Sequence, residues 1–331
     1  MKARRDGTTV VLGKDGQTLY DQSGYGRKTK EGLTLSPEEA LYLVLKKKIT
    51  VTDETFESLI SVFSAGDGFM RRFLVYRDMR ERGYVIQPGP HDFRVFRRGE
   101  KPGTGRTNYL IRVLSERDLI TFRDLSGEVE SAVHMRKQFV LAAVDDEGEL
   151  TYYDVKADHL KESGPAPEIP PVTAIRAGNS VITQDVAAFP DPLWFGTKLD
   201  KTRLMFSPME TLYLLERDIL TIDGDADGTA IRHDIPKEDA EWQEKYQVYA
   251  YLRNLGHVPR TAYKFGHHFR VYSGEKKHSE LLVHAIPADS SMPMSVISRS
   301  VRLAHSVRKK MLFACADQHG IEFIEFARIK L

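Results

Sequence analysis

The chain has 331 residues, of which 41% are hydrophobic and 29% are charged, so we expect an ordinary core-forming protein of at least two domains. Its formal net charge of +1 excludes the strongly basic overall field that many nucleic-acid-binding proteins carry. The single cysteine excludes an internal disulfide framework, no apolar run approaches the ~18–20 residues that cross a bilayer, and the charged start is unlike a signal peptide, so we expect a cytoplasmic protein.

The first predicted helix begins at Ser36, where a serine N-cap, a proline at the first helical position and a glutamate precede an apolar run. A second helix is predicted over 69–82 and ends at Gly83, because glycine favours the turn that closes a helix. Strands follow. In the second half we predict a helix from Ser207, a helix over 241–255, strands at Phe269–Tyr272 and Leu281–Ile286, a helix over 294–309, a strand at Met311–Ala316 and an alternating run over 321–331.

The two halves of the sequence repeat each other. Four motifs return in the same order at an offset of 171–176 residues, which chance does not produce. The matching segments are Leu35–Leu43 with Phe206–Leu214, Val75–Val85 with Val248–Val258, Phe93–Phe96 with Phe269–Tyr272, and Arg136-Lys137 with Arg308-Lys309. We therefore predict an internal duplication, in which small differences in offset mark loop insertions.

The join between the copies is predicted at 162–171, where four prolines and a glycine oppose helix and strand alike. We predict the fold class α+β, as two tandem copies of one unit. Each unit has a helical or mixed N-terminal lobe and then a mixed β-sheet flanked by helices. The predicted boundaries are 1–68 and 69–162 in the first copy, and 163–240 (with the linker) and 241–331 in the second.

The copies differ in side chains that can move protons. The second copy carries Tyr272, His278 and Lys309. The corresponding positions of the first copy carry Phe96, Arg106 and Lys137, with the same spacing of 31 residues between the last two positions. Phenylalanine and arginine cannot exchange a proton near neutral pH, whereas a phenol and an imidazole can. Each of the three has an ordinary structural reading by itself, but their joint presence in one copy favours a catalytic site there.

These motifs resemble those of a known family. Phe269–Tyr272, His278-Ser279 and Val301–Lys310 are similar to the active-site motifs of archaeal tRNA-splicing endonucleases, and the likeness covers essentially the whole chain. The length and the duplication resemble the homodimeric branch of that family, whose subunits each hold one degenerate and one active copy. The resemblance makes 69–162 a degenerate nuclease-like domain and 241–331 the catalytic domain.

The resemblance implies a metal-independent cleavage of precursor tRNA at bulge–helix–bulge sites, with no cofactor. In the family's reaction a ribose 2′-OH attacks the adjacent phosphorus and expels the 5′-oxygen, which leaves a 2′,3′-cyclic phosphate and a 5′-hydroxyl. Carried over, His278 is the acid, Lys309 stabilises the charged phosphorane, and Tyr272 acts either as the base or as a group that orients the 2′-OH.

Two further roles are implied by the resemblance. Arg302 from each subunit stacks on a flipped base of the bulge, and its seven-residue separation from Lys309 predicts that both lie on one helix face. The acidic turn of the first copy docks into the active copy of the other subunit and fixes the homodimer. That turn consists of Asp145, Asp146, Glu147, Gly148 and Glu149.

Two other functions remain open from the sequence. A metal nuclease could use His267, His268, His278 or His284, although neighbouring histidines in a strand point to opposite faces and no carboxylate cluster accompanies them. A non-catalytic, structural or RNA-binding subunit is the second alternative, which the intact trio in the second copy disfavours. For Arg302 the alternative is an ordinary surface contact with phosphate, and for the acidic turn it is a solvated hairpin turn.

Overall fold

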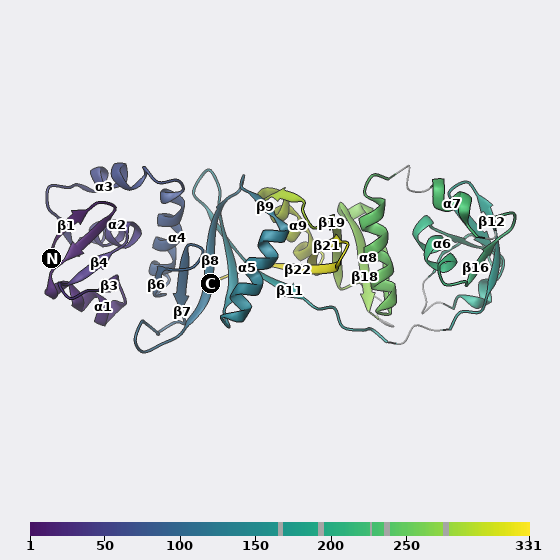
Figure 1. Ribbon diagram of the computed structural model, residues 1–331, viewed down its shortest axis with the longest axis horizontal. Helices are drawn as coiled ribbons and strands as arrows, with labels where there is room; N and C mark the ends of the chain where they lie inside the picture. Colours follow the sequence, from purple (N-terminus) through teal and green to yellow (C-terminus); the bar gives the residue numbers. More distant parts are fainter. Residues whose placement is uncertain (165–167, 191–194, 226, 235–238, 274–277) are drawn as a thin grey trace. The chain divides into compact units, whose positions relative to one another are not determined.

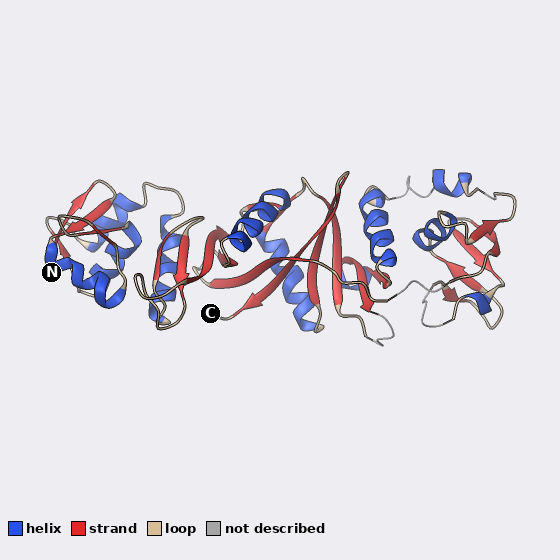
Figure 2. Ribbon diagram, turned by 60° about the horizontal axis from the view of Figure 1, so that its bottom comes forward, coloured by secondary structure: helices blue, strands red, loops and turns tan. Residues whose placement is uncertain are grey.

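The computed structural model describes residues 1–164, 168–190, 195–225, 227–234, 239–273 and 278–331. Residues 165–167 of the predicted join lie outside this set. Tertiary contacts divide the chain into two compact units, one of residues 1–156, 291–299 and 326–331, the other of residues 157–290 and 300–325. Each unit combines helices with mixed β-sheets (Figures 1 and 2), so the predicted α+β class is confirmed.

The N-terminal lobe of the first unit is a small mixed domain. Its five-stranded sheet has the order β3-β4-β2-β1-β5. The predicted helix is α2 (Pro37–Leu45), and Ser36 caps it as expected. The other elements are β1 (Lys2–Asp6), β2 (Thr9–Leu12), α1 (Gln17–Ser23), β3 (Arg27–Lys28), β4 (Leu33–Leu35), β5 (Thr50–Val51) and α3 (Phe56–Phe63).

The second unit repeats this lobe strand for strand. Its strands have the order β14-β15-β13-β12-β16, which matches the order in the first lobe when β12 to β16 are taken as the equivalents of β1 to β5. The elements are β12 (Val172–Ala177), β13 (Ser180–Thr183), β14 (Thr197–Lys198), β15 (Leu204–Phe206), α6 (Pro208–Leu215), β16 (Leu220–Ile222) and α7 (Thr229–Asp234). Most of these strands have two to four residues, too few for an alternating pattern to stand out in the sequence.

In the first unit the chain continues into a larger sheet. The predicted second helix is α4 (Phe69–Glu81), and Gly83, with φ +86°, follows its end. Strands β6-β7-β8-β10-β11 are neighbours in that order, and α5 (Phe122–His134) lies between β9 (Leu119–Thr121) and β10 in the chain. The strand bounds are β6 (Ile86–Pro88), β7 (Phe93–Phe96), β8 (Thr107–Ser115), β10 (Gln138–Val144) and β11 (Leu150–Asp158).

The second unit has the equivalent helix α8 (Trp242–Asn254) followed by Gly256, which has φ +77°. Its strands follow the order β17-β18-β19-β21-β22, with β19 and β21 parallel. Their bounds are β17 (His257–Ala262), β18 (His267–Ser273), β19 (Leu281–Pro287), β21 (Lys310–Asp317) and β22 (Gly320–Ile329). Alternate residues of β18, Phe269 and Val271, join the apolar core of this unit, so the residues between them face the other side of the sheet.

Two segments of the second half belong to the first unit. Strand β20 (Ser291–Pro293) pairs antiparallel with β9, and the hydroxyl groups of Tyr153 and Ser298 are hydrogen-bonded at 2.9 Å. Arg82 also donates to the carbonyl oxygen of Leu331, at 3.0 Å. The duplicated copies are therefore not two independently closed domains.

Helix α9 (Met294–Ser306) is shorter than the predicted 294–309. Arg308 adopts the left-handed φ of +57°, and the N–H of Lys309 closes back on the carbonyl of Ala304 at 2.8 Å. This turn satisfies helix carbonyls that would otherwise have no partner. The predicted end of the helix was therefore wrong, because a charged residue rather than a glycine takes the left-handed position.

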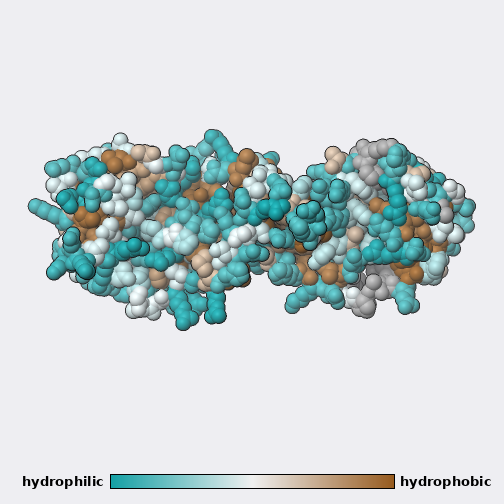
Figure 3. Space-filling model, viewed as in Figure 1, coloured by the Kyte–Doolittle hydropathy of each residue, from teal (hydrophilic) through white to brown (hydrophobic). Residues whose placement is uncertain are grey.

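The described helices include none long and apolar enough to span a membrane. On the face drawn in Figure 3, hydrophilic side chains predominate and the hydrophobic ones form small, separate areas. The apolar side chains instead gather in two internal clusters, one in each copy.

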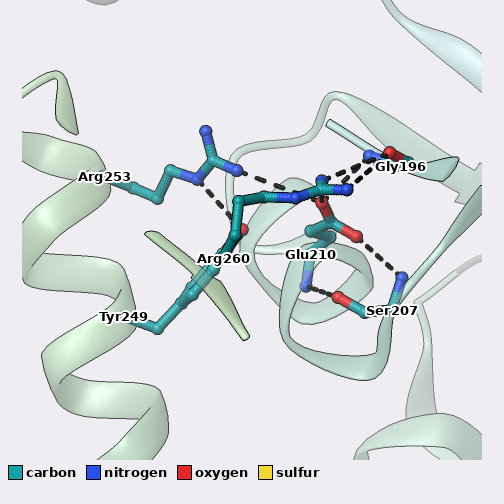
Figure 4. A network of polar contacts seen from close by, with 6 residues as sticks. All are labelled: Gly196, Ser207, Glu210, Tyr249, Arg253 and Arg260. Carbon is teal, nitrogen blue, oxygen red and sulfur yellow. Dashed lines mark hydrogen bonds and ion pairs between the residues drawn. The ribbon is translucent and has the colours of Figure 1, made fainter. Parts of the chain in front are cut away.

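A buried carboxylate ties the lobes of the second copy together (Figure 4). Glu210 completes the capping box of α6, because its carboxylate accepts the N–H of Ser207 at 2.8 Å while Ser207 caps the helix. The same carboxylate accepts the N–H of Gly196 at 2.9 Å and pairs with Arg260 at 3.0 Å. Arg253 of α8 stands 4.0 Å away and donates to the hydroxyl of Tyr249 at 3.0 Å.

The first copy has the same arrangement with one cation fewer. Glu39 caps α2 and accepts the N–H of Gly26 at 2.7 Å, and Arg80 donates to Tyr76 at 3.0 Å. The position equivalent to Arg260 is Gln87, which donates to the carbonyl of Gly24 at 3.0 Å. Burial raises the pKa of the Glu39 carboxyl above its ordinary value, although hydrogen bonds from Ser36 and Gly26 oppose that shift.

This difference predicts unequal costs for one substitution. Glu210→Gln leaves Arg253 and Arg260 partly buried without their carboxylate, and should destabilise α6 by about 2–4 kcal/mol. Glu39→Gln should cost less, because the amide keeps an acceptor oxygen and removes a charge that burial disfavours. Hydrogen–deuterium exchange of α6 and α2 amides in the two variants measures the difference. Equal loss of protection in both helices would contradict this account.

Candidate active site

An open hollow on the second unit is lined by two distant segments of the chain. His278, Ser279 and Glu280 lie just before β19, and the other lining residues lie at the end of α9 and the start of β21. The described residues of this second segment are His305, Ser306, Arg308, Lys309 and Lys310. The structure therefore brings His278 and Lys309, which the sequence analysis paired, to one place.

Lys309 is held in the hollow by the turn that ends α9. Its ammonium group donates to the carbonyl oxygen of Ser279 at 2.6 Å, so the residue that follows His278 fixes the end of the lysine side chain. Partial burial and the nearby cation of Arg270 lower the pKa of Lys309 from its ordinary value. The ammonium is thus positioned by a neutral partner, and no carboxylate of the described residues forms an ion pair with it, which leaves its charge available to an anion.

Tyr272 lies in the same row of the sheet as Lys309. Val271 pairs with Leu281 on β19, and Leu281 pairs with Lys310 on β21. The next row of the sheet therefore holds Tyr272, which follows Val271, beside Glu280 and Lys309, which precede Leu281 and Lys310. Two strand spacings separate the outer two backbones, roughly 10 Å. By alternation Tyr272 faces away from the apolar core that holds Val271. Its side chain is only 8% exposed, and Tyr272 is not among the described residues that line the hollow.

Arg302 is exposed on α9 and also lies outside the described lining of the hollow. The argument that placed Arg302 and Lys309 on one helix face was wrong, since α9 ends at Ser306 and Lys309 follows a left-handed residue. Helical spacing therefore does not relate these two side chains.

The first copy keeps the geometry of this corner without its proton-transfer groups. The ammonium of Lys137 donates to the carbonyl of Thr107 at 2.5 Å, and the N–H of Lys137 donates to the carbonyl of Ala132 at 2.9 Å. Arg136 adopts φ +57°, as Arg308 does. Arg106 precedes Thr107 as His278 precedes Ser279, so the structure aligns the same residues that the spacing aligned.

The acidic turn of the first copy joins β10 to β11. The carboxylate of Asp145 accepts the N–H groups of Glu147 at 3.0 Å and Glu149 at 2.8 Å, so this side chain closes the turn itself. Asp146 forms an exposed ion pair with Arg117. Glu147 and Glu149 are exposed. The turn is therefore a rigid element that presents carboxylates to the outside.

The histidines of the alternative metal site form a cluster apart from this hollow. The ring of His284 lies 4.2 Å from that of His268 and 5.4 Å from that of His267, measured between centroids. The expectation that His267 and His268 face opposite sides was wrong, because an irregularity in the pairing of β17 with β18 occurs at His267 and interrupts the alternation. A carboxylate does accompany the cluster, since Glu241 lies 3.4 Å from His268.

Burial sets the chemistry of this cluster. It lowers the pKa values of His267, His268 and His284 to about 4, with smaller contributions from the neighbouring cationic groups. Nδ1 of His267 and Nδ1 of His284 are buried, and neither has a hydrogen-bond partner in the part of the chain that the structure describes. No group of three or more His, Cys, Asp or Glu side chains in the described ranges is arranged to hold a metal ion.

The cluster predicts a specific pH dependence. Unfolded histidines protonate near pH ~6.5, so between that pH and about 4 the unfolded chain binds more protons. The free energy of unfolding should therefore be constant above this window and fall, by on the order of 1 kcal/mol per histidine, as the pH drops through it. Urea unfolding at a series of pH values measures this. His284→Phe should flatten the slope and His278→Asn, an exposed control, should not; an unchanged slope in His284→Phe contradicts the assignment.

Two family models each match the chain twice. The tRNA intron endonuclease catalytic C-terminal domain matches residues 69–152 and 242–323. The tRNA intron endonuclease N-terminal domain matches residues 1–60 and 177–232. The alternation of the two models along the chain confirms the duplication predicted from the repeated motifs.

Relatives that match nearly the whole chain share the name tRNA-splicing endonuclease. A tRNA-splicing endonuclease of Methanococcoides burtonii is 39% identical over 95% of each chain. A tRNA-splicing endonuclease of Methanosarcina acetivorans is 36% identical over the whole of both chains. A tRNA-splicing endonuclease of Haloferax volcanii is 32% identical over 98% of each. The similarity therefore extends over both copies and not only over one lobe.

Proposed function

The chain belongs to the tRNA intron endonuclease family, and from this premise we propose that it excises introns from precursor tRNA by cutting at bulge–helix–bulge sites. The observation that carries the proposal is the hollow shared by His278 and Lys309, whose ammonium is fixed by the carbonyl of Ser279. An imidazole beside a fixed cation, on an open surface, suits a phosphodiester better than a small buried ligand.

The proposed reaction is an intramolecular transesterification. The ribose 2′-oxygen forms a bond to the scissile phosphorus while the bond from phosphorus to the 5′-oxygen breaks. His278 gives its proton to the departing 5′-oxygen, and the Lys309 ammonium offsets the negative charge that builds on the phosphorane. Tyr272 either takes the proton of the attacking 2′-OH as a base or accepts a hydrogen bond that orients the 2′-OH, in which case the proton leaves to water. The products are a 2′,3′-cyclic phosphate and a 5′-hydroxyl, and none of these steps calls for a metal ion.

Two copies of the chain would supply two such sites, which suits a substrate with two cleavage points. We propose a homodimer in which the acidic turn of one subunit contacts the second copy of the other. The rigidity of the turn, which Asp145 closes, and its outward carboxylates support a docking role. Arg302 of each subunit would stack on an unpaired base, and its exposure on α9 supports contact with RNA rather than packing.

The cleavage site is tested by making the same lysine-to-alanine change in each copy separately. With a bulge–helix–bulge RNA and no added metal, Lys309→Ala should cut at least about 100-fold more slowly, whereas Lys137→Ala should cut at the wild-type rate. Both lysines donate to a backbone carbonyl in equivalent turns, so the pair separates chemistry from local structure.

The chemistry of the RNA ends completes this test. Wild-type products should carry a cyclic phosphate and a 5′-hydroxyl, and cleavage should persist in excess chelator. Binding without cleavage by the wild-type protein would favour a non-catalytic RNA-binding subunit. Loss of cleavage in chelator would favour a metal nuclease.

The homodimer is tested at the acidic turn. The triple change Asp146→Asn, Glu147→Gln and Glu149→Gln leaves Asp145 in place, so the turn keeps the hydrogen bonds that close it. Removing these charges should weaken dimerisation at least about tenfold, as measured by sedimentation across a concentration series. Asp317→Asn in the equivalent turn of the second copy is the control. A triple variant that dimerises as tightly as wild type would remove the turn from the interface.

A further inference from the structure

Arg270 stands beside the proposed cleavage site, on the face of the sheet opposite to that of Phe269 and Val271. It lies on β18 two residues before Tyr272, so alternation places both on the same side. Its guanidinium carbon is 5.8 Å from the centre of the Tyr272 ring. Its positive charge also reaches Lys309, whose pKa it helps to lower. Arg270 therefore lies within electrostatic reach of both residues.

The first copy shows what this arginine does where no catalytic trio exists. The equivalent residue, Arg94, lies opposite Gln87 in the pairing of β6 with β7 and donates to its side-chain oxygen at 3.0 Å. An internal acceptor thus takes one of the guanidinium donors of Arg94. This contact ties the exposed arginine to the neighbouring strand.

The second copy has removed that acceptor. Arg260 lies opposite Arg270 in the pairing of β17 with β18, and a guanidinium cannot accept a hydrogen bond. Arg260 is itself engaged by Glu210 and by the carbonyl of Gly196. Nε of Arg270 is buried and has no hydrogen-bond partner among the described residues. A buried donor without a partner is costly, and a role of this side chain in the neighbouring site would explain why that cost is retained.

We propose that Arg270 is a second cation of the cleavage site and that its guanidinium donates to a non-bridging oxygen of the scissile phosphate, opposite Lys309. The phosphorane carries its developing charge on two such oxygens, and a cation from β18 and one from the turn before β21 can each serve one of them. Exchange of Gln87 for Arg260 between the copies is the change that frees Arg270 for this contact. The inference rests on the proposed function and adds a residue to it.

The test compares Arg270→Ala and Arg270→Lys with Arg94→Ala, the same change in the first copy. In single-turnover cleavage at saturating enzyme, Arg270→Ala should be slower by about 100-fold or more and Arg270→Lys by a smaller factor. Arg94→Ala should cut at the wild-type rate. Arg270→Ala that cuts as fast as wild type would overturn the inference while the proposed function stands. Wild-type protein that does not cut would overturn both.

A sulfur substitution separates contact with the phosphate from a structural role. Replacing one non-bridging oxygen of the scissile phosphate by sulfur weakens a hydrogen bond from a guanidinium, so wild-type cleavage should slow for one stereoisomer. That penalty should shrink in Arg270→Ala and Arg270→Lys, because the contact is already lost or altered. If Arg270→Ala does not fold, Arg270→Lys carries the test. An Arg270→Lys variant that keeps both the wild-type rate and the wild-type sulfur penalty overturns the inference.

Discussion

The hydrogen bond from the Lys309 ammonium to the carbonyl of Ser279 determines where the site can form. It joins the turn that ends α9 to the residue next to His278, and it requires the left-handed Arg308 to bring the lysine back over β19. A charged hydrogen bond of this kind contributes about 1.5–3 kcal/mol and also fixes a direction. The contact therefore fixes the cation of the proposed reaction next to the chain segment that carries the acid.

The first copy retains this contact but lacks the proton-transfer groups of the proposed site. Lys137 donates to Thr107 in the same way, so the corner belongs to the fold that the two copies share. What differs is the set of groups placed around the corner, with Arg106 and Phe96 in one copy and His278 and Tyr272 in the other. In the proposed mechanism, catalysis thus depends on side chains placed on a scaffold that both copies share, which is the usual relation between a site and its fold.

The two copies also differ in the charge around their buried glutamates. Glu39 in the first copy faces one arginine, whereas Glu210 in the second faces two, because Gln87 is replaced by Arg260. The added cation is held by the buried carboxylate, and on the opposite strand it leaves Arg270 without the acceptor that Arg94 has. One substitution therefore couples the interior of the lobe to the electrostatics of the site.

The sequence by itself determined the duplication, the family and the α+β class, because repeated motifs and N-caps such as Ser36 and Ser207 are local signals. It predicted the long helices 69–82 and 241–255 to within about one residue, since apolar periodicity and a closing glycine mark them directly. The sequence did not predict the short strands of the N-terminal lobes, because a two-residue strand shows no alternating pattern. It also did not predict the end of α9, because an arginine such as Arg308 does not signal a left-handed φ.

Only the tertiary structure decided which side chains meet. The pairing of β18, β19 and β21 aligns Tyr272 with Lys309, and the turn after α9 brings Lys309 to His278, whereas Arg302 stays outside the described lining of the hollow. The same pairing set Arg260 against Arg270 and gathered His267, His268 and His284 around an irregular strand. Register and chain reversal are long-range properties, so no local pattern in the sequence could have fixed these contacts.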